Sequence, residues 1–381
     1  MNNKVIFNQG LTFDDVLLLP DYSDFSRTEI DLSSQLTRHI KLKLPLVSAP
    51  MDTVTESLLA ISLGKLGGIG IIHRNLMIAD QVNEIQKVKQ QKLTVGAAIG
   101  ASRDNTDRIK ALAEAKTDVI VVDSAHGYAK NVIDTIRFIK KNYPNIDVIG
   151  GNVATYEGAK ALIKAGVDGL RVGMGPGAIC TTRVISGMGV PQITALIETC
   201  RAGAMAKIPV MADGGIKFSG DIVKALAAGA ATVMMGNFFA SAQEAPGQIL
   251  ELTAQEVPSR FKSIVNTNQK YYKFKSYRGM GSVGAMQKGV SVKSEDEFHG
   301  KNYQDRVLVA EGVEGLVPIK GSVKSLVDQA IGGIKSGLYY VGAKTIEELQ
   351  KKAKFMQITQ ASLTESHPHD ILITNPGMNY Q

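Results

Sequence analysis

Eight short apolar segments recur along the first two-thirds of the chain, and most of them end in or just before Gly, Ser, Asp or Asn. Most begin about 25 residues after the previous one, which leaves room for a strand, a crossover helix and two short loops. Their apolar character on both faces is typical of parallel strands that are covered on both sides. The segments are residues 45–49, 68–72, 94–99, 119–124, 147–151, 169–173, 209–215 and 232–237.

The stretches between these segments have the spacing of amphipathic helices. Residues 131–143, 156–166 and 219–229 place apolar side chains at helical intervals, and the last two end in Gly, as helix C-caps do. Eight strand–helix units in series predict an α/β protein whose parallel sheet closes into a (β/α)₈ TIM barrel. An open, doubly wound sheet is the alternative, but the series contains no sign of a reversal in strand order.

Two irregularities in the series indicate where function resides. The gap between the sixth and seventh strands holds a Gly-rich loop at 173–192, and residues 238–320 separate the eighth strand from a helical segment at 321–336. Barrel enzymes carry their chemistry on loops at the carboxyl ends of the strands, so both excursions should lie on the active face. We expect residues 1–237 to form the barrel units, 238–320 a finger and mobile flap, and 321–381 the closing helix and C-terminal tail.

Composition and charge narrow the class of protein. The 381 residues are 44% hydrophobic and 21% charged, as in a soluble globular protein. The apolar runs are too short to span a bilayer, and the N-terminus lacks the features of a signal peptide, so we expect a cytoplasmic protein. The net charge of +7 is spread along the chain without a basic block, which favours a phosphate-bearing small molecule over nucleic acid as the ligand.

The two cysteines have contrasting surroundings. Cys180 lies in the Gly-rich loop next to Thr182 and Arg183, where we expect an accessible, reactive thiol; a buried structural thiol is the alternative. Cys200 lies in a helical stretch, where a small apolar filler is the default interpretation. Two unpaired thiols in a cytoplasmic chain argue against a disulfide framework.

Other strand ends carry polar or glycine residues. Residues 212–215 and 235–237 lie where barrels commonly bind phosphate through backbone N–H groups, although a tight turn also needs glycine. Asp123, Ser124 and Asn152 end the fourth and fifth strands on the same face, and helix N-capping is the alternative role for them. The six histidines show no metal-ligand spacing, so no catalytic transition metal is expected.

A series of motifs spanning almost the whole chain resembles the IMP dehydrogenase family, in the same order. GMP reductase, the sister enzyme, shares the barrel and the cysteine loop, but its first and last motifs are generally less similar to those of this chain. The motifs are LTFDDVLLLP (11–20), SAPMDTVTE (48–56), GGIGIIHRN (67–75), VDSAHG (122–127), GNVAT (151–155), GMGPGAICTTR (173–183), ADGGIKFSGDIVKALAAGA (212–230), SYRGMGSVGAM (276–286), EGVEGLV (311–317) and ESHPHD (365–370).

The resemblance implies an oxidoreductase that converts IMP to XMP with NAD⁺ in guanine nucleotide biosynthesis. Cys180 would attack C2 of the purine, hydride would pass to NAD⁺, and water would hydrolyse the covalent intermediate. Arg171 would organise the cysteine loop, and Thr182 and Glu311 would form a proton relay beside the base.

The resemblance also implies a set of binding residues. The substrate would contact Ser48, Met51, Asp213, Gly215, Gly236, Asn237, Tyr277, Met280, Gly281 and Glu311. The cofactor would contact Asp123, Ser124, Asn152 and Gly173. A potassium ion would be held by Gly173, Gly175 and Cys180 together with Glu365, Ser366 and His367 of a neighbouring subunit, which implies a homotetramer.

Two departures from the family pattern remove single features. Family members usually carry a pair of regulatory CBS modules between the second and third barrel units, whereas residues 84–98 run straight through, so regulation through those modules should be absent. A serine that touches the phosphate is replaced by Ala178, and the lost hydrogen bond should cost about 0.5–1.5 kcal/mol.

The segment 248–272 is longer than expected and could be a surface finger or a subunit contact.

The third departure concerns the reaction itself. The Arg-Tyr-Phe triplet that activates water in the flap is replaced by Asp296-Glu297-Phe298, while Tyr303 and Arg306 lie nearby in a different order. Either these two residues or the Glu297 carboxylate could act instead. Loss of water activation is what a GMP reductase would show, since it converts GMP to IMP with NADPH, so that reaction stays an alternative, as does a purine-nucleotide-binding scaffold without turnover. The choice between NAD and NADP is left open.

Overall fold

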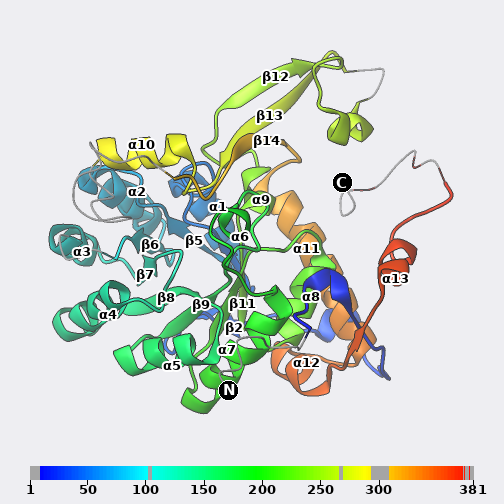
Figure 1. Ribbon diagram of the computed structural model, residues 1–381, viewed down its shortest axis with the longest axis horizontal. Helices are drawn as coiled ribbons and strands as arrows, with labels where there is room; N and C mark the ends of the chain where they lie inside the picture. The colour runs from blue at the N-terminus through cyan, green and yellow to red at the C-terminus, as the bar shows by residue number, and fades with distance from the viewer. Residues whose placement is uncertain are drawn as a thin grey trace.

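Eight parallel strands form a closed barrel, in the order β10-β11-β4-β5-β6-β7-β8-β9 (Figure 1). The computed structural model describes residues 9–101, 105–265, 269–292, 309–371, 373 and 377. Pairing of β11 with β4 closes the sheet, with Met235 opposite Ser48, so the predicted barrel is confirmed and the open sheet is wrong. The strands are β4 (Leu46–Ser48), β5 (Ile69–Ile72), β6 (Gly96–Ile99), β7 (Val119–Asp123), β8 (Asp147–Val153), β9 (Gly169–Val172), β10 (Val210–Asp213) and β11 (Thr232–Met235).

Alternate residues of each strand enter two separate apolar layers. Val119 and Val121 of β7 point into the barrel, where they pack with Ile69, Ile71 and Met234. Side chains with the opposite orientation, such as Ile120 and Val122, belong to the larger core between the strands and the helices. Because both faces are buried, these strands are apolar throughout instead of alternating, as the sequence pattern indicated.

A ring of helices surrounds the barrel and supplies the other half of the outer core (Figure 1). Helix α5 ends at Gly166 with φ +101°, as predicted, whereas the C-cap of α8 is Ala228 and Gly229 follows it with φ +108°. A single helix, α2, joins β5 to β6. The ring consists of α1 (Ser57–Leu66), α2 (Ile78–Gln90), α3 (Thr106–Glu114), α4 (Lys130–Asn142), α5 (Tyr156–Ala165), α7 (Gln192–Ala206), α8 (Ser219–Ala227) and α11 (Val323–Val341).

Between β11 and α11, the described residues leave the barrel, and three strands among them form a finger. Its strands β12 (Ile249–Thr253), β13 (Tyr271–Arg278) and β14 (Glu314–Pro318) make an antiparallel sheet that projects beyond the helix ring (Figure 1). The segment 248–272, for which the sequence left a surface finger or a subunit contact as alternatives, contains β12, the 3₁₀ helix η4 (Ser259–Ile264) and the start of β13. At the base of the finger, the buried Lys275 ammonium donates to the carbonyls of Ala242, Gln243 and Ala245, which ties β13 to the end of the barrel.

The short elements complete the barrel's ends. Hairpin β2 (Ser34–Gln35) and β3 (Lys41–Leu42) closes the amino-terminal end, because Leu36 and Leu42 pack among the interior side chains. Strand β1 (Val16–Leu18) pairs with β15 (Phe355–Gln357) near the C-terminal tail. The others are η1 (Phe13–Asp15), η2 (Arg27–Glu29), α6 (Thr182–Ile185), α9 (Asn237–Ala240), α10 (Val283–Ser291), α12 (Ile346–Lys352) and α13 (Gln360–Glu365).

Two further points concern membrane-spanning helices and the flap residues. Among the described residues, no helix combines the length and the apolar character that crossing a membrane requires. The flap residues Asp296, Glu297, Phe298, Tyr303 and Arg306, on which the third departure from the family pattern rests, lie outside the described residues.

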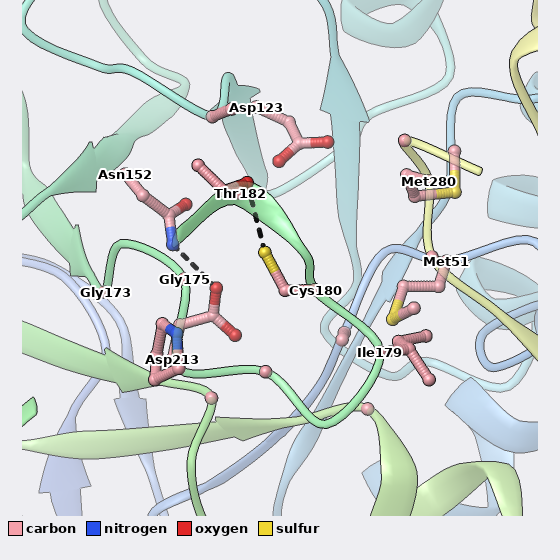
Figure 2. Close-up of a pocket in the computed structure, with 18 of the residues that line it drawn as sticks. Met51, Asp123, Asn152, Gly173, Gly175, Ile179, Cys180, Thr182, Asp213 and Met280 are labelled. Atoms are coloured by element: carbon pink, nitrogen blue, oxygen red, sulfur yellow. Dashed lines mark hydrogen bonds between the residues drawn. The ribbon is translucent and has the colours of Figure 1, made fainter. Parts of the chain in front are cut away.

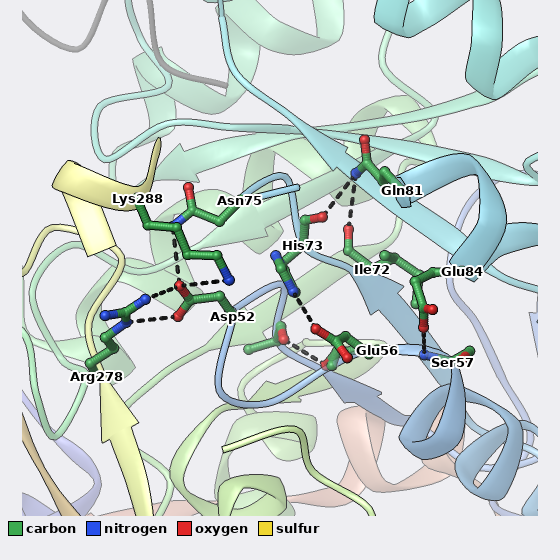
Figure 3. Close-up of polar contacts among 12 residues, drawn as sticks. Asp52, Glu56, Ser57, Ile72, His73, Asn75, Gln81, Glu84, Arg278 and Lys288 are labelled. Atoms are coloured by element: carbon green, nitrogen blue, oxygen red, sulfur yellow. Dashed lines mark hydrogen bonds and ion pairs between the residues drawn. The ribbon is translucent and has the colours of Figure 1, made fainter. Parts of the chain in front are cut away.

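Glu84 on α2 caps the neighbouring helix α1, which suggests a stability test. Its Oε2 accepts the backbone N–H of Ser57 at 2.6 Å, and Lys87 donates to Oε1 at 2.5 Å (Figure 3). Burial raises the pKa of Glu84, but the hydrogen bonds from Lys87 and Ser57 outweigh it and lower the pKa below its usual value. We expect Glu84→Gln to lower the free energy of unfolding by about 1 kcal/mol at pH 7.

The direction of the pKa shift determines the pH range in which Glu84 stabilises the fold. A carboxyl with a lowered folded-state pKa stabilises the fold above its unfolded pKa, about 4.3, and the contribution disappears as the pH falls through the folded value. Urea unfolding should therefore show a deficit in Glu84→Gln at pH 7 that shrinks below about pH 4. Glu347→Gln is the control, because Glu347 pairs with Lys351 on an exposed helix face and should matter little. Equal deficits in the two variants would contradict the capping role.

Candidate active site

A cavity of about 220 Å³ opens at the carboxyl ends of the barrel strands. Its walls come from the carboxyl ends of β4, β5 and β7 through β11 and from the loops that follow some of them. The rest of the wall comes from Tyr277, residues 279–281 and Glu311, in the excursion between β11 and α11. Figure 2 shows Met51, Met280 and Ile179 on one side of Cys180 and Asn152 and Asp213 on the other, with Asp123 above Thr182. The cavity therefore has an apolar side and a charged side, with the predicted nucleophile between them.

Cys180 takes part in a chain of three groups that can carry a proton. Its thiol donates to Thr182 Oγ1 at 3.2 Å (Figure 2). The Thr182 hydroxyl in turn donates to Glu311 Oε2 at 2.8 Å. Thr182 begins α6, two residues after the cysteine, whereas Glu311 comes from the far side of the excursion, just before β14. A thiol, a hydroxyl and a carboxylate in this order are the components of an activated nucleophile.

Backbone hydrogen bonds hold this chain in register. The N–H of Thr181 donates to the carbonyl of Glu311 at 3.0 Å, and Val313 N–H donates to the Ile179 carbonyl at 3.0 Å. On the other side, Glu311 N–H donates to the Gly281 carbonyl at 3.1 Å, and Gly279 N–H donates to the Val313 carbonyl at 3.0 Å. Residues 311–313 are therefore held between the cysteine loop and residues 279–281.

A buried guanidinium organises the charged side of the cavity. Arg171 on β9 donates through Nε to Asp213 at 2.9 Å and through Nη1 to Asp123. Asn152 on β8 donates to the same Asp213 oxygen at 2.8 Å. Burial lowers the pKa of Arg171, but the two carboxylates outweigh it and raise the pKa above its ordinary value, so the group stays cationic. One buried cation thus holds two carboxylates in place.

Arg74 is a charged wall residue that sequence reasoning missed. It follows β5, is buried, and places Nε 3.6 Å from the second oxygen of Asp123. A signal for Arg74 was available, because it lies just beyond the carboxyl end of β5, and Asp123 and Asn152 lie at the same ends of β7 and β8. Other lining residues that were not predicted are Ala49, Pro50, Ala125, Met174, Pro176, Gly177, Ile179 and Gly279.

The helix-capping alternative for the polar strand ends is wrong. Helix α4 has Ala129 at its N-cap, and α5 has Thr155, whose side chain accepts the Gly158 N–H at 3.2 Å. Asp123, Ser124 and Asn152 instead line the cavity. They are therefore available to a ligand.

Close approach requires glycine at two wall positions. Gly173 has φ +151°, and a Cβ there would meet the carbonyl oxygen of Asp213 at 2.2 Å. A Cβ at Gly236 would meet the Tyr277 hydroxyl at 2.7 Å. Burial, together with the nearby Asp213 carboxylate, raises the pKa of Tyr277, so its hydroxyl stays a neutral hydrogen-bond donor. The cavity thus combines exposed backbone with a phenol donor at the ends of β10 and β11.

Several predicted residues do not line this cavity. Ser48 is completely buried and accepts the Thr55 hydroxyl at 2.8 Å. Gly215 and Asn237 follow the lining residues Gly214 and Gly236 without joining them, and Asn237 borders a small neighbouring hollow. The tail residues Glu365, Ser366 and His367 lie at the end of α13, where the His367 ring is 6.0 Å from that of Phe218.

A group of potential metal ligands lies at the opposite end of the barrel. His39, Asp147 and Asp168 bring their ligand atoms within 4.8 Å of one another. The carboxylates already accept hydrogen bonds, Asp147 from Thr37 and Asp168 from Lys140 at 2.8 Å. Through Thr37 and His39, the Asp147 carboxylate ties the loop between β2 and β3 to the barrel.

Comparison with known proteins identifies a family. A family model described as IMP dehydrogenase / GMP reductase domain matches residues 10–369. The inosine-5'-monophosphate dehydrogenase of Cryptosporidium parvum is 43% identical over 415 aligned positions, covering 98% of each chain. That of Borreliella burgdorferi is 41% identical, covering 97% of this chain and 99% of the relative.

A third relative differs in length. The inosine-5'-monophosphate dehydrogenase of Aquifex aeolicus is 39% identical and covers 98% of each chain. Its alignment runs over 503 positions, more than the 381 residues of this chain, so that relative carries a long segment that is missing here.

The two thiols should react very differently. The Cys180 thiol faces the cavity, whereas burial raises the pKa of the Cys200 thiol to about 12. At pH 7 Cys200 then carries on the order of a thousandfold less thiolate than an ordinary cysteine. We expect iodoacetamide to alkylate Cys180 alone in the folded protein, as measured by peptide mass spectrometry. Cys180→Ala should take up no label until it is unfolded, and rapid labelling of Cys200 in native protein would contradict this assignment.

Proposed function

The chain belongs to the IMP dehydrogenase / GMP reductase family, and on that premise we propose that it oxidises IMP to XMP with NAD⁺. The observation that carries the proposal is the contact of Cys180, Thr182 and Glu311 inside the cavity. Three relatives covering nearly the whole chain bear the name inosine-5'-monophosphate dehydrogenase, which supports the same reaction.

The thiol–hydroxyl–carboxylate chain can serve both halves of the proposed reaction. In the first half, Cys180 Sγ bonds to C2 of the purine while its proton moves through Thr182 to Glu311. Bound NAD⁺ supplies the acceptor for the hydride that leaves C2. In the second half, after the first proton has left to solvent, water adds to C2 and gives a proton to the same relay, which returns it to the Cys180 sulfur displaced as XMP forms. The net change is IMP, NAD⁺ and water to XMP, NADH and a proton.

The walls of the cavity suit a purine nucleotide. Met51, Met280 and Gly281 offer an apolar surface for the base, and Asp213 can accept ribose hydroxyls. The backbone beside Gly214, Gly215, Gly236 and Asn237, with the Tyr277 hydroxyl, would hold the phosphate. Ala178 adds no side-chain donor there, so the phosphate depends on these backbone groups and on Tyr277.

The charged side suits the nicotinamide riboside. Asp123 and Asn152 lie on adjacent strands, and Arg171 holds the Asp123 carboxylate in a defined orientation. Asp123, Ser124 and Asn152 would bind ribose hydroxyls and the carboxamide, and Gly173 would allow close approach. This wall is made of barrel strands and their ends, independently of the excursion.

A monovalent cation, normally potassium, would bind the cysteine loop through carbonyls of Gly173, Gly175 and Cys180. Gly173 and Gly175 have φ of +151° and +75°, and a Cβ at either position would collide with its surroundings, which fits a loop that presents its backbone. Glu365, Ser366 and His367 of a neighbouring subunit would complete the site in a homotetramer. The division into barrel units 1–237, insertion 238–320 and closing segment 321–381, without CBS modules, belongs to the same proposal.

One sequence observation favours a second candidate, GMP reductase. The flap carries Asp296-Glu297-Phe298 where the water-activating arginine and tyrosine of IMP dehydrogenases are expected. A reductase that releases ammonia from C2 of GMP needs no water activation, and it would use the same thiol. The two reactions are separated by their substrates.

An assay of nicotinamide reduction tests the choice of reaction. With IMP and NAD⁺ the protein should produce NADH and XMP, and with GMP and NADPH it should release no ammonia. Cys180→Ala should lose turnover entirely while still binding IMP in calorimetry, because the thiol forms the bond to C2. Turnover of GMP alone would replace the first candidate with the second, and binding without turnover of either substrate would favour the scaffold.

Replacement of Glu311 tests the proton relay. Glu311→Gln keeps the shape of the side chain but removes the proton acceptor, so we expect a fall in kcat of roughly 10²–10⁴-fold. If Glu311 also accepts the proton of water, single-turnover experiments should show accumulation of a covalent Cys180 adduct, measured by mass spectrometry. Glu198→Gln is the control and should retain most activity, because Glu198 pairs with Arg201 on an exposed face of α7. Unchanged kcat in Glu311→Gln would assign the relay to another residue.

A further inference from the structure

A completely buried carboxylate joins the excursion to the barrel. The Asp52 side chain, in the loop after β4, is 0% exposed. Arg278 donates to it through Nε at 3.1 Å and through Nη2 at 2.5 Å, and Asn75 donates to it at 3.2 Å. Figure 3 shows these groups converging on Asp52, with the Lys288 ammonium 4.0 Å away.

The groups around Asp52 come from three separate parts of the chain. Asn75 follows β5 and also donates to the carbonyl of Ala285 in α10 at 2.9 Å. Arg278 is the last residue of β13, and its own N–H donates to Thr53 Oγ1 at 3.3 Å. Lys288 lies on α10. The carboxylate therefore fixes both the end of β13 and the start of α10 against the barrel.

The residues that follow Arg278 form the apolar wall of the cavity. Gly279, Met280 and Gly281 all line it. Met51, the residue before Asp52, lies on the same side of Cys180 as Met280 (Figure 2). Residues 279–281 are hydrogen-bonded to 311–313, and these in turn to 179–181. A continuous path of contacts therefore runs from Asp52 through Arg278 to the backbone that holds Glu311 against the cysteine loop.

The electrostatics make this contact a strong anchor. Burial raises the pKa of Asp52, but the hydrogen bonds from Arg278 and Asn75 outweigh it, so the pKa is lowered and the group stays anionic. The facing groups are the guanidinium of Arg278, the ammonium of Lys288, the His73 ring and the Asn75 amide. Removing one member of a buried ion pair leaves the other without a counter-charge, which is far more damaging than loss of a surface pair.

We propose that Asp52 is a positioning residue for the reaction: by holding Arg278 it sets the base-binding wall and the register of Glu311 against Thr182 and Cys180. This inference rests on the proposed function for its kinetic consequences, but not for its structural ones. Asp52 acts on the nucleotide side of the cavity and on the relay. The cofactor side, carried by Asp123, Asn152 and Arg171 on barrel strands, lies outside its path of contacts.

The test compares Asp52→Asn with an equally buried ion pair that lies away from the cavity. Asp168 accepts Lys140 at 2.8 Å and the Val148 N–H at 2.9 Å, and it precedes β9 at the amino-terminal end of the barrel. Asp168→Asn should lower the melting temperature and leave the kinetic constants of the folded enzyme unchanged. Asp52→Asn should raise KM for IMP and lower kcat, each by roughly tenfold or more, with little change in KM for NAD⁺.

A second variant, Arg278→Lys, keeps the test decisive if Asp52→Asn does not fold. Arg278→Lys keeps the positive charge but loses the two-pronged contact, so it should change KM for IMP and kcat in the same direction and by less than Asp52→Asn. A split between the two KM values is a result that simple destabilisation does not produce. Wild-type kinetic constants in folded Asp52→Asn, or in Arg278→Lys if the first variant does not fold, would overturn the inference. So would equal kinetic losses in Asp168→Asn.

Hydrogen exchange separates this inference from the proposed function. In Asp52→Asn, amides of residues 279–281 and 311–313 should exchange at least tenfold faster, whereas those of β7 and β8 should be unchanged. If the wild-type protein oxidises no IMP, the proposed function fails and the exchange result still decides the role of Asp52. If it oxidises IMP and exchange in Asp52→Asn is unaltered, the positioning role fails while the proposed function stands.

Discussion

Closure of the parallel sheet through the pairing of β11 with β4 is the constraint on which the rest of the structure depends. It brings the first and last strands together, so that Met51 after β4 and Gly236 after β11 become neighbours across one cavity. It also buries both faces of every barrel strand, which explains why the strands are apolar throughout. With the carboxyl ends of all eight strands gathered at one end, residues distant in the chain can act on one ligand.

Several buried charges that line or flank the cavity are paired with a counter-charge. Arg171 is held between Asp123 and Asp213, Arg74 faces the other oxygen of Asp123, and Asp52 is paired with Arg278. Ions removed from water need such partners, because an unpaired one would be neutralised or would destabilise the fold. The pairs also fix orientation, which a ligand-binding wall requires before the ligand arrives.

The site is divided between the barrel and the excursion. The barrel supplies the nucleophile loop and the charged wall, whereas the excursion supplies Glu311, Met280 and Gly281. The thiol and its carboxylate partner therefore belong to parts of the chain that meet only through tertiary contacts. The nucleophile and the proton acceptor can be aligned only if the excursion is anchored, and the Asp52–Arg278 pair is a physical candidate for that anchor. Lys275, three residues before Arg278 on β13, donates to three carbonyls and anchors the same strand.

The sequence by itself determined the eight strands, the barrel, the thiol at Cys180 and its place on the active face, because strand length, helical periodicity and glycine placement are local properties. The family resemblance read from the motifs is confirmed, and it named Thr182 and Glu311 as partners. Only the tertiary structure showed that these side chains meet, that Ser48 is buried, that Arg74 lines the cavity, and that Asp52 pairs with Arg278. The reason is that burial and pairing of charges arise between segments more than two hundred residues apart, as with Asp52 and Arg278, and no local pattern records them.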